Sequence, residues 1–309
     1  MKVRDLIIIG AGPAGMSAGI YAARSALSPL IIESQMPGGQ VALTDFIENY
    51  PAFPNGMSGQ ELTKLMEEQC NNFNVEFMNF VQVDFVEKEN KIFKLKTNRG
   101  DFFAKTVIVA TGASPAEQGI PGEREFKGRG VSYCATCDGP LFKDKDILVV
   151  GGGDSAVQEA IYLTKFVSSL KIVHRRDKLR ARKMLQEKAF KNPKIDILWN
   201  SNLLEIKGKD LVERVVIFNN KTNQKREIRI GGVFMYVGFK PNSSLVKDLV
   251  EMDKLGRIIT DYKMRTSTTG LFAAGDVRNT PLRQVVTAVS DGAIAAINAE
   301  EYLEYEMKI

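Results

Sequence analysis

The stretch "DLIIIGAGPAGMSAGIYAARSALSPLIIES", residues 5–34, decides the fold. An apolar run is followed by a glycine turn, a stretch of helical periodicity and a second apolar run, which predicts a strand, a helix and a second strand. Gly10, Gly12 and Gly15 have the spacing G-x-G-x-x-G. The first glycine permits a tight turn, the second lets a pyrophosphate approach the backbone, and the third allows close helix packing. The stretch therefore predicts a Rossmann-like fold.

Glu33 stands at the end of the second apolar run. An acid at this place accepts hydrogen bonds from ribose hydroxyls, and the helix start offers unpaired N–H groups to the phosphates. The glycine spacing alone is weak evidence, because glycine turns occur in many α/β proteins. With the strand, helix and acid around it, the pattern predicts an adenosine site for FAD or NAD.

The same pattern returns in "DILVVGGGDSAVQEAIYLTKFVSSLKIVHRRDKLR", residues 146–180. Gly151, Gly153 and Ala156 occupy the three positions of the glycine pattern. Alanine is an accepted variant of the third position. We therefore expect a second dinucleotide-binding fold in the same chain.

This second copy ends in basic residues where the first has an acid. His174, Arg175 and Arg176 follow the expected strand directly, and Arg180 is close behind. Guanidinium groups bind phosphate through charge-assisted hydrogen bonds, whereas an acid repels it. The pattern therefore favours the 2′-phosphate of NADPH, with a solvated basic turn as the alternative. For His174, the only histidine of the chain, we expect packing or a phosphate contact.

A third glycine-containing stretch, residues 268–303, lies near the end of the chain. The apolar residues 271–274 predict a strand, Gly275 a turn, and residues 283–303 a helix with small residues on its packing face. Asp276, after the turn, suits a hydroxyl of a ribityl chain or a pyrophosphate group. It equally suits a helix cap, and the residues alone leave both open.

Composition narrows the class of protein. With 309 residues, of which 44% are hydrophobic and 26% charged, we expect a globular protein of two domains. No apolar run reaches the length of a membrane span, and the N-terminal run is better explained as a strand than as a secretory signal, so we expect a cytoplasmic protein. The 42 basic and 37 acidic residues are scattered, which argues against nucleic acid as a partner.

The stretch "VSYCATCDGPLF", residues 131–142, contains Cys134 and Cys137 with two residues between them. A closed zinc site needs four ligands, and elsewhere the chain offers only Cys70 and His174, so we expect no metal. A structural disulfide is disfavoured, because cytosolic reductants oppose it and so short a loop constrains the unfolded chain weakly.

Redox chemistry remains for this pair. A C-x-x-C thiol can have a lowered pKa, which keeps the nucleophilic thiolate available. Asp138, next to the pair, can act as general acid and base. Its alternative role is that of a turn residue before Gly139.

The third cysteine, Cys70, falls on a predicted helix in "GQELTKLMEEQCNNF". The apolar periodicity of this helix includes Leu62, Leu65 and Met66. We therefore expect Cys70 to be a packing residue.

Nine motifs give the chain a wider resemblance. The chain is similar to the bacterial-type, low-molecular-weight thioredoxin reductases, in which these motifs occur in the same order and at the same spacing. The similarity extends from residue 1 to about 305 and rests on "GAGPAGMSAGIYAARS", "PGGQ", "ENYPAF", "VIVATGA", "IPGE", "GRGVSYCATCDGPLF", "GGGDSAVQEA", "HRRDKLR" and "LFAAGDV".

The resemblance implies a homodimeric enzyme with FAD and NADPH as cofactors and thioredoxin as the protein partner. NADPH reduces the flavin, the flavin reduces the Cys134–Cys137 disulfide, and the dithiol reduces thioredoxin. Cys137 would be the thiol near the flavin and Cys134 the thiol that attacks thioredoxin. The implied motion is a rotation of the NADPH domain between the half-reactions.

The implied fold is α/β, with two Rossmann-like domains of the three-layer ββα type that binds FAD and NAD(P). An NADPH domain, residues 116–244, would be inserted into a discontinuous FAD domain, residues 1–115 and 245–309. The junctions would be "ATGASP" and "VGFKPN", which both contain glycine and proline.

The resemblance also assigns site residues by motif. The FAD adenosine half falls to Gly10, Gly12, Gly15 and Glu33, and the flavin, ribityl and pyrophosphate part to Gly39, Gln40, Asn49, Asp276, Arg283 and Gln284. NADPH falls to Gly153, Asp154, Ser155, His174, Arg175, Arg176 and Arg180.

Some residues depart from the family pattern. Gln158 replaces a usual acid, Phe239 replaces a common histidine, and "GASPAEQGIPGE" lacks the usual basic and apolar residues. The alternatives are an enzyme of the same fold with ferredoxin as donor or with another protein disulfide as partner, and a flavin-binding redox sensor without steady turnover.

Overall fold

The computed structural model describes residues 2–44, 47–133 and 135–306. The chain divides into two compact units. Unit 1 consists of Met1–Ser114 and Lys240–Ile309, and unit 2 of Pro115–Phe239. The unit junctions thus fall inside "ATGASP" and "VGFKPN", and the second lies a few residues before the boundary expected at residue 245. The reason is Asn242, which is tied to unit 1 by a hydrogen bond from its backbone N–H to the Gly112 carbonyl.

Residues 5–34 form the strand, helix and strand expected from them. β1 (Val3–Ile9) leads into α1 (Pro13–Arg24), and β2 (Leu30–Ile32) returns parallel to β1 with Ile7 opposite Leu30. Pro13 at the first helical turn suits this helix start, because proline has no N–H to leave unpaired there.

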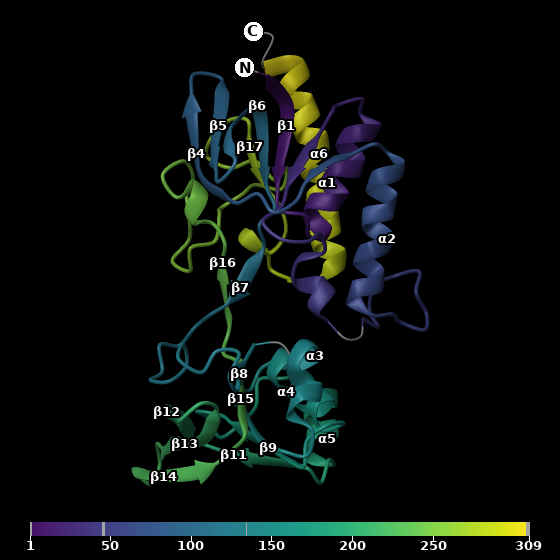
Figure 1. The fold of residues 1–309 in the computed structure, drawn as a ribbon. Coiled ribbons are helices and arrows are strands. Elements are labelled where there is room, and N and C mark those ends of the chain that lie inside the picture. Colours follow the sequence, from purple (N-terminus) through teal and green to yellow (C-terminus); the bar gives the residue numbers. More distant parts are fainter. Residues whose placement is uncertain (1, 45–46, 134, 307–309) are drawn as a thin grey trace. The chain divides into compact units, whose positions relative to one another are not determined.

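The sheet of unit 1 combines parallel and antiparallel strands (Figure 1). Its order is β3-β2-β1-β6-β5-β4, and β17 pairs with β6. β1, β2, β3 and β17 run parallel to their partners, whereas β4, β5 and the first half of β6 form an antiparallel meander. The remaining bounds are β3 Glu76–Met78, β4 Val83–Glu89, β5 Ile92–Thr97, β6 Gly100–Val109 and β17 Leu271–Ala273.

Alternation along the central strands creates the layers of unit 1. Leu6 and Ile8 of β1 pack in the same cluster as α1, whereas Ile7 and Ile9 pack with residues of the meander such as Phe93. The helices α1, α2 (Gly59–Asn72) and α6 (Val285–Glu301) therefore cover one face and the meander the other, as Figure 1 also shows.

Close contact between α1 and α6 depends on small residues. A Cβ on Gly292 of α6 would overlap the carbonyl of Ala14, and a Cβ on Gly275 would lie 3.0 Å from the Ala14 side chain. Gly275 also has φ +78°, a region that favours glycine. The small-residue face predicted for this helix is thus confirmed, and the helix ends at Glu301 before a short π-helical turn, η5 (Tyr302–Glu306).

Cys70 is fully buried on α2, as predicted. Its thiol donates to the Met16 carbonyl at 3.4 Å, and burial raises its pKa to about 12. Leu62 is buried as well, whereas Leu65, which belongs to the same apolar periodicity, is 43% exposed. Met66 packs against the core cluster that contains Cys70, and Leu65 lies on the more exposed side of the helix.

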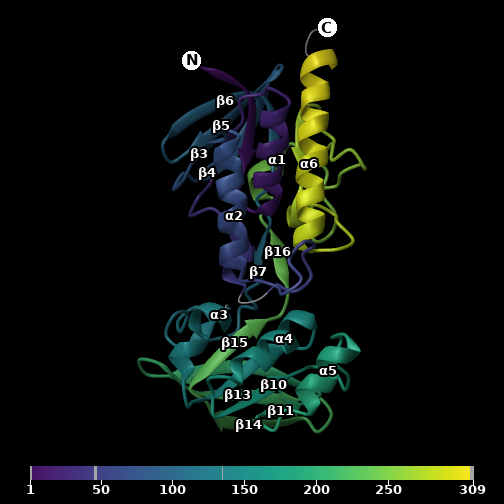
Figure 2. The ribbon, with the colours of Figure 1, turned by 90° about the vertical axis from the view of Figure 1, so that its right-hand side faces the viewer.

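Unit 2 repeats the three-layer plan (Figure 2). Its parallel sheet has the order β11-β10-β9-β15-β8, and β12, β13 and β14 form a separate antiparallel sheet. The strands are β8 Val131–Ser132, β9 Asp146–Gly151, β10 Ser169–Val173, β11 Ile195–Leu198, β12 Ser201–Gly208, β13 Val212–Asn219, β14 Gln224–Arg229 and β15 Gly232–Tyr236. The helices are α3 Ala135–Asp138, α4 Asp154–Leu163 and α5 Lys183–Phe190.

The same alternation separates the two faces of this parallel sheet. Ile147 and Val149 of β9 pack with Ala160 of α4, whereas Leu148 and Val150 pack in the cluster that holds the buried residues of β12 and β13. Both units are therefore mixed α/β folds with a sheet between helices and antiparallel strands.

The two connecting segments pair with each other as β7 (Ala113–Pro115) and β16 (Phe239–Pro241). Within the described residues, none of the helices has the length and apolarity needed to cross a membrane.

We predict that Gly292→Ala lowers the free energy of unfolding by about 1–3 kcal/mol, because the added methyl group overlaps the Ala14 carbonyl. Urea denaturation followed by circular dichroism would measure this. The control is Ser290→Ala, an exposed position of the same helix, for which we expect less than about 0.5 kcal/mol. Equal stability of the two variants would contradict the close packing of α1 and α6.

Candidate functional site

The glycine turn of unit 1, residues 10–15, places an open space before the start of α1. Gly10 has φ +105°, and a Cβ there would lie 2.5 Å from the Ala110 carbonyl oxygen. A Cβ on Gly15 would overlap the Gly10 carbonyl. Gly12, the N-cap of α1, differs, since a Cβ on it would meet no described atom within 4 Å. A pyrophosphate can therefore approach the backbone at Gly12 and the first N–H groups of α1.

Glu33 lies beside this turn, directly after β2. One carboxylate oxygen accepts from the Ala11 N–H at 2.7 Å, and the other accepts from the Gln35 N–H at 2.9 Å. The carboxylate thus holds the glycine turn in place, and its remaining lone pairs can accept from a ribose. The hydrogen bond between Ala11 and Glu33, which holds this turn, had no signal in the local sequence.

Gly39 and Gln40 belong to a loop that crosses the same turn. They begin η1 (Gly39–Leu43), and the preceding Gly38 donates its N–H to the Ala11 carbonyl at 2.8 Å. A Cβ on Gly39, which has φ +57°, would lie 3.2 Å from the Gly12 Cα. The structure therefore brings Gly12 and Gly39 together.

Asn49 and Gln284 also meet, although they are 235 positions apart. The Asn49 amide donates to the Gln284 side-chain oxygen at 2.8 Å. Gln284 is the N-cap of α6, and its backbone N–H is held by the Thr287 hydroxyl. The start of α6 is thereby fixed against the loop that contains Asn49.

Asp276 lies in η4 (Gly275–Val277), next to the start of α6 in the chain. It caps neither helix, because the N-caps are Ala274 and Gln284, so the capping alternative is wrong. Burial raises the pKa of its half-buried carboxyl, while the Arg283 charge acts in the opposite direction. Among the described groups, none donates a hydrogen bond to this carboxylate, which leaves it available to a hydroxyl group.

Asp291, a buried acid that contacts the same turn, is not predicted by the sequence pattern. Asp291 of α6 accepts from the Gly275 N–H at 3.1 Å and lies 3.5 Å from Arg278 Nε. It fixes the turn that carries Asp276. Its place inside a helix gave no local sign of this contact.

The glycine turn of unit 2, residues 151–156, has the geometry of the first. A Cβ on Gly151 would lie 2.5 Å from the Tyr236 carbonyl oxygen, and one on Gly153 would meet no described atom within 4 Å. Gly153 is the N-cap of α4. This unit therefore also offers an open helix start at the carboxyl end of a parallel strand, where dinucleotides bind in such folds.

The side chains expected to bind NADPH fall into two groups, one exposed and one engaged in bonds inside the protein. The exposed group, which is available to a ligand, consists of Ser155, Arg175, Arg176 and Arg180. The engaged group consists of Asp154 and His174. Asp154 is engaged, since its carboxylate accepts from the Arg182 backbone N–H at 2.7 Å and pairs with Arg182 Nε at 2.9 Å.

His174 is buried, and each of its ring nitrogens lies against a backbone carbonyl. Nδ1 is 3.0 Å from the Gly151 oxygen and Nε2 is 2.9 Å from the Lys178 oxygen. This geometry supports the packing alternative for His174 and argues against a direct phosphate contact through its ring.

Two anchors bracket the redox stretch. Cys134 lies outside the described residues, as does the side chain of Cys137, whose backbone belongs to α3. On one side of Cys134, the Tyr133 hydroxyl donates to Glu123 at 2.7 Å. On the other side, the Ala135 N–H donates to the Tyr236 hydroxyl at 2.8 Å. The half-buried Asp138 follows Cys137 in the chain.

Glu123 was not predicted as a site residue. It is fully buried and also accepts from the N–H groups of Gln118 and Ile120. Burial and the Glu123 carboxylate both raise the pKa of Tyr133, so its hydroxyl keeps the proton that it donates. An acid in a turn is typically exposed, and only the fold shows that this one is an internal anchor.

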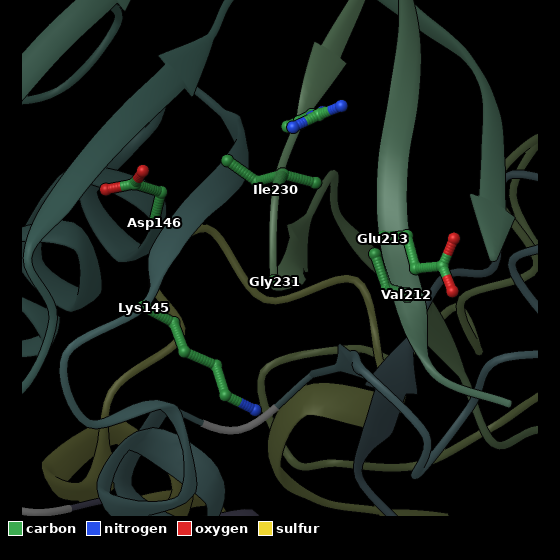
Figure 3. A pocket seen from close by; sticks show the side chains of 7 residues that line it. Lys145, Asp146, Val212, Glu213, Ile230 and Gly231 are labelled. Carbon is green, nitrogen blue, oxygen red and sulfur yellow. The ribbon is translucent and has the colours of Figure 1, made fainter.

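A shallow hollow of about 380 Å³ in unit 2 is not this site (Figure 3). Lys145 and Asp146, which line it, lie at the amino end of β9, whereas Gly151 ends that strand. In the parts of the chain that the structure describes, no cluster of three or more His, Cys, Asp or Glu residues could hold a metal ion.

Comparison with known proteins gives matches over nearly the whole chain. The family described as "Pyridine nucleotide-disulphide oxidoreductase" matches residues 4–292. The thioredoxin reductase of Peptoclostridium acidaminophilum is 49% identical, with 98% of each chain covered. That of Bacillus subtilis (strain 168) is 46% identical, covering 98% of this chain and 96% of its own. The crystal structure of Lactococcus lactis thioredoxin reductase in the FR conformation is 47% identical with a TM-score of 0.94, covering 97% of this chain and 99% of its own.

We predict that Tyr133 and Glu123 are energetically coupled. A double-mutant cycle of Tyr133→Phe and Glu123→Gln, measured by urea unfolding, should give a coupling of about 1.5–3 kcal/mol, because the hydroxyl bonds to a buried carboxylate. The control is Tyr262→Phe at an exposed tyrosine, which we expect to change the free energy of unfolding by less than about 0.5 kcal/mol. Additive effects of the two substitutions would rule out the anchor.

Proposed function

We infer the function from the premise that this chain belongs to the pyridine nucleotide-disulphide oxidoreductase family and, within it, to the thioredoxin reductases. It is a flavoenzyme that uses NADPH to reduce thioredoxin. The observation that carries this is the pair of open glycine turns, one in each unit, with an acid beside the first and arginines beside the second. The alternative donors and partners are not favoured by the relatives found.

Unit 1 is proposed to bind FAD. Its adenosine half would lie along Gly10, Gly12 and Gly15, with its ribose on Glu33. Support comes from the space before Gly12, which stays open because glycine has no side chain. Further support comes from the placement of Glu33 against the same turn.

The remaining residues would hold the flavin side of FAD. Asp276, a half-buried carboxylate without a described hydrogen bond, would accept from a hydroxyl of the ribityl chain. The other proposed contacts, which lie in the crossing loop or around the start of α6, are Gly39, Gln40, Asn49, Arg283 and Gln284.

Unit 2 is proposed to bind NADPH and to carry the redox pair. The pyrophosphate would lie at Gly153 and Ser155, and the 2′-phosphate at Arg175, Arg176 and Arg180. Asp154 and His174 would act through their bonds inside the protein, Asp154 to Arg182 and His174 to the two carbonyls, and not through direct contact with the nucleotide.

FAD, when bound, passes two electrons from NADPH to the disulfide between Cys134 and Cys137. In the proposed reaction, the Cys134 thiolate then attacks the thioredoxin disulfide, and a bond forms between Cys134 and one thioredoxin sulfur while the other leaves as a thiolate. The Cys137 thiolate attacks Cys134, which releases reduced thioredoxin and restores the disulfide. Asp138 supplies and collects the protons.

Unit 2 would thus carry both the hydride donor and the disulfide, while the flavin is bound to unit 1. Both cannot occupy the flavin at once, so we propose that unit 2 rotates between the half-reactions about the segments at residues 112–116 and 237–241. The glycines Gly112 (φ +64°) and Gly238 (φ +126°) of these segments support such a hinge. A homodimer in the cytoplasm completes the proposal.

We predict that Cys134→Ser and Cys137→Ser each abolish NADPH-dependent reduction of thioredoxin, because either change removes one sulfur of the relay. The assay is NADPH oxidation with thioredoxin from the same organism. Cys70→Ser is the matched control, since its buried thiol takes no part, and it should keep activity if it folds. Activity in either relay variant would overturn the dithiol mechanism.

We predict that a covalent bridge between units 1 and 2 stops turnover but spares one half-reaction, because rotation is then prevented. A lysine-reactive cross-linker would be applied to the FAD-loaded enzyme, with bridge positions mapped by mass spectrometry. Stopped-flow absorbance would follow flavin reduction by NADPH and flavin reoxidation by the disulfide separately. Molecules bridged within one unit serve as the control, and full turnover of molecules bridged between units would contradict the rotation.

A further inference from the structure

His174 joins two parts of the nucleotide site in unit 2. Its Nδ1 lies 3.0 Å from the carbonyl oxygen of Gly151 in the glycine turn, and its Nε2 lies 2.9 Å from that of Lys178. Lys178 belongs to the basic loop, residues 175–182, which also carries the exposed Arg175, Arg176 and Arg180. The imidazole ring therefore bridges the pyrophosphate turn and the loop proposed for the 2′-phosphate.

Both contacts require an N–H donor from the ring. Both partners are carbonyl oxygens, which accept hydrogen bonds, while a neutral imidazole has a single N–H to donate. In the neutral ring one nitrogen must therefore present its lone pair to a carbonyl oxygen. Only the protonated ring, with two N–H groups, satisfies both contacts.

Other interactions oppose protonation in the free protein. Burial lowers the pKa of His174, the two carbonyls act in the opposite direction, and the charges of Arg180 and Arg176 lower the pKa further. The ring is packed tightly, because a Cβ on Gly152 would overlap it. His174 is thus a bridge whose second hydrogen bond is opposed by burial and, in addition, by nearby positive charge.

The charged groups of the surrounding elements are mostly cationic. On the glycine-turn side, the acid is Asp154, which is already paired with Arg182. The β11–β12 turn contributes Trp199, an uncharged ring in edge contact with the imidazole. The charged residues of the basic loop and the start of α5 are Arg175, Arg176, Asp177, Lys178, Arg180, Arg182 and Lys183.

We propose that His174 is a positioning residue that takes up one proton when a 2′-phosphorylated adenosine nucleotide binds, and thereby clamps the basic loop to the glycine turn. The inference rests on the proposed binding of NADPH to unit 2. The phosphate dianion pairs with Arg176 and Arg180, which neutralises the charge that adds to burial in opposing protonation and places negative charge near the ring. The proton comes from solvent, and the imidazolium then donates to Gly151 and Lys178 together.

The coupling between proton uptake by His174 and nucleotide binding has a defined sign. Because the bound state holds the extra proton, the affinity for the phosphorylated nucleotide rises as pH falls from the pKa of His174 in the complex to its pKa in the free protein. Above and below this interval, His174 contributes no pH dependence. A nucleotide without the 2′-phosphate leaves the arginine charges in place and gains nothing.

The single histidine allows a direct test on the wild-type, FAD-loaded protein. The ring would be labelled with ¹³C, and its NMR signal titrated with pH alone, with adenosine 2′,5′-bisphosphate and with adenosine 5′-monophosphate. We expect the pKa of His174 to rise by at least about one unit with the bisphosphate and to stay unchanged with the monophosphate.

The possible failures are distinguishable. Isothermal titration calorimetry on the same samples reports whether the bisphosphate binds. Binding without a shift of the His174 signal overturns the inference and leaves the NADPH assignment intact. Failure of the bisphosphate to bind overturns both.

A variant provides a second readout. His174→Gln can donate one hydrogen bond but cannot take up a proton at these pH values. We expect it to lose the proton uptake that calorimetry measures as a dependence of binding heat on the ionisation enthalpy of the buffer. The 2′-phosphate itself titrates near pH 6, but it does so equally with both proteins.

The control for this variant is Asp177→Asn, which changes an exposed charge of the same loop and leaves the ring in place. We expect this control to keep the uptake. Equal proton uptake by His174→Gln and wild type would show that another group is responsible and would overturn the proposal.

Discussion

The constraint on which the whole molecule depends is the lack of room where a parallel strand turns into a helix. In unit 1, no side chain fits on Gly10 or Gly15, because each Cβ would press on a backbone carbonyl. Such contact draws α1 onto the sheet and leaves the space before Gly12 open. Glu33 and Gly39 both lie against this turn, and unit 2 repeats the solution at Gly151 and Gly153.

Much of this plan could be predicted from local pattern. The two glycine turns, their flanking strands and the strand at 271–273 follow from apolar periodicity and glycine spacing, since these features act within about ten residues. The exposure of Leu65 does not follow from periodicity. Its spacing suits a buried face, but which positions of an amphipathic helix are covered depends on the neighbouring element, which periodicity does not contain.

The contacts that hold the site are of another kind. Asn49 with Gln284 and Glu123 with Tyr133 each join parts of the chain that only the fold brings together. A single sequence carries no signal for such pairs, because their residue types are as common on the surface as in buried networks. The motif predicts His174 as a nucleotide residue. Its burial between the carbonyls of Gly151 and Lys178 depends on the fold and has no signal in the motif.

The burial of Cys70 has a consequence for the sulfur chemistry of the whole enzyme. With its pKa raised to about 12, on the order of one Cys70 thiol in 10⁵ is ionised at neutral pH. An electrophile or an oxidant in the cell therefore finds almost no nucleophile at this position. A protein that passes electrons through sulfur gains from this inertness, because a third reactive thiol would offer the relay a wrong partner and divert its disulfide into a dead end.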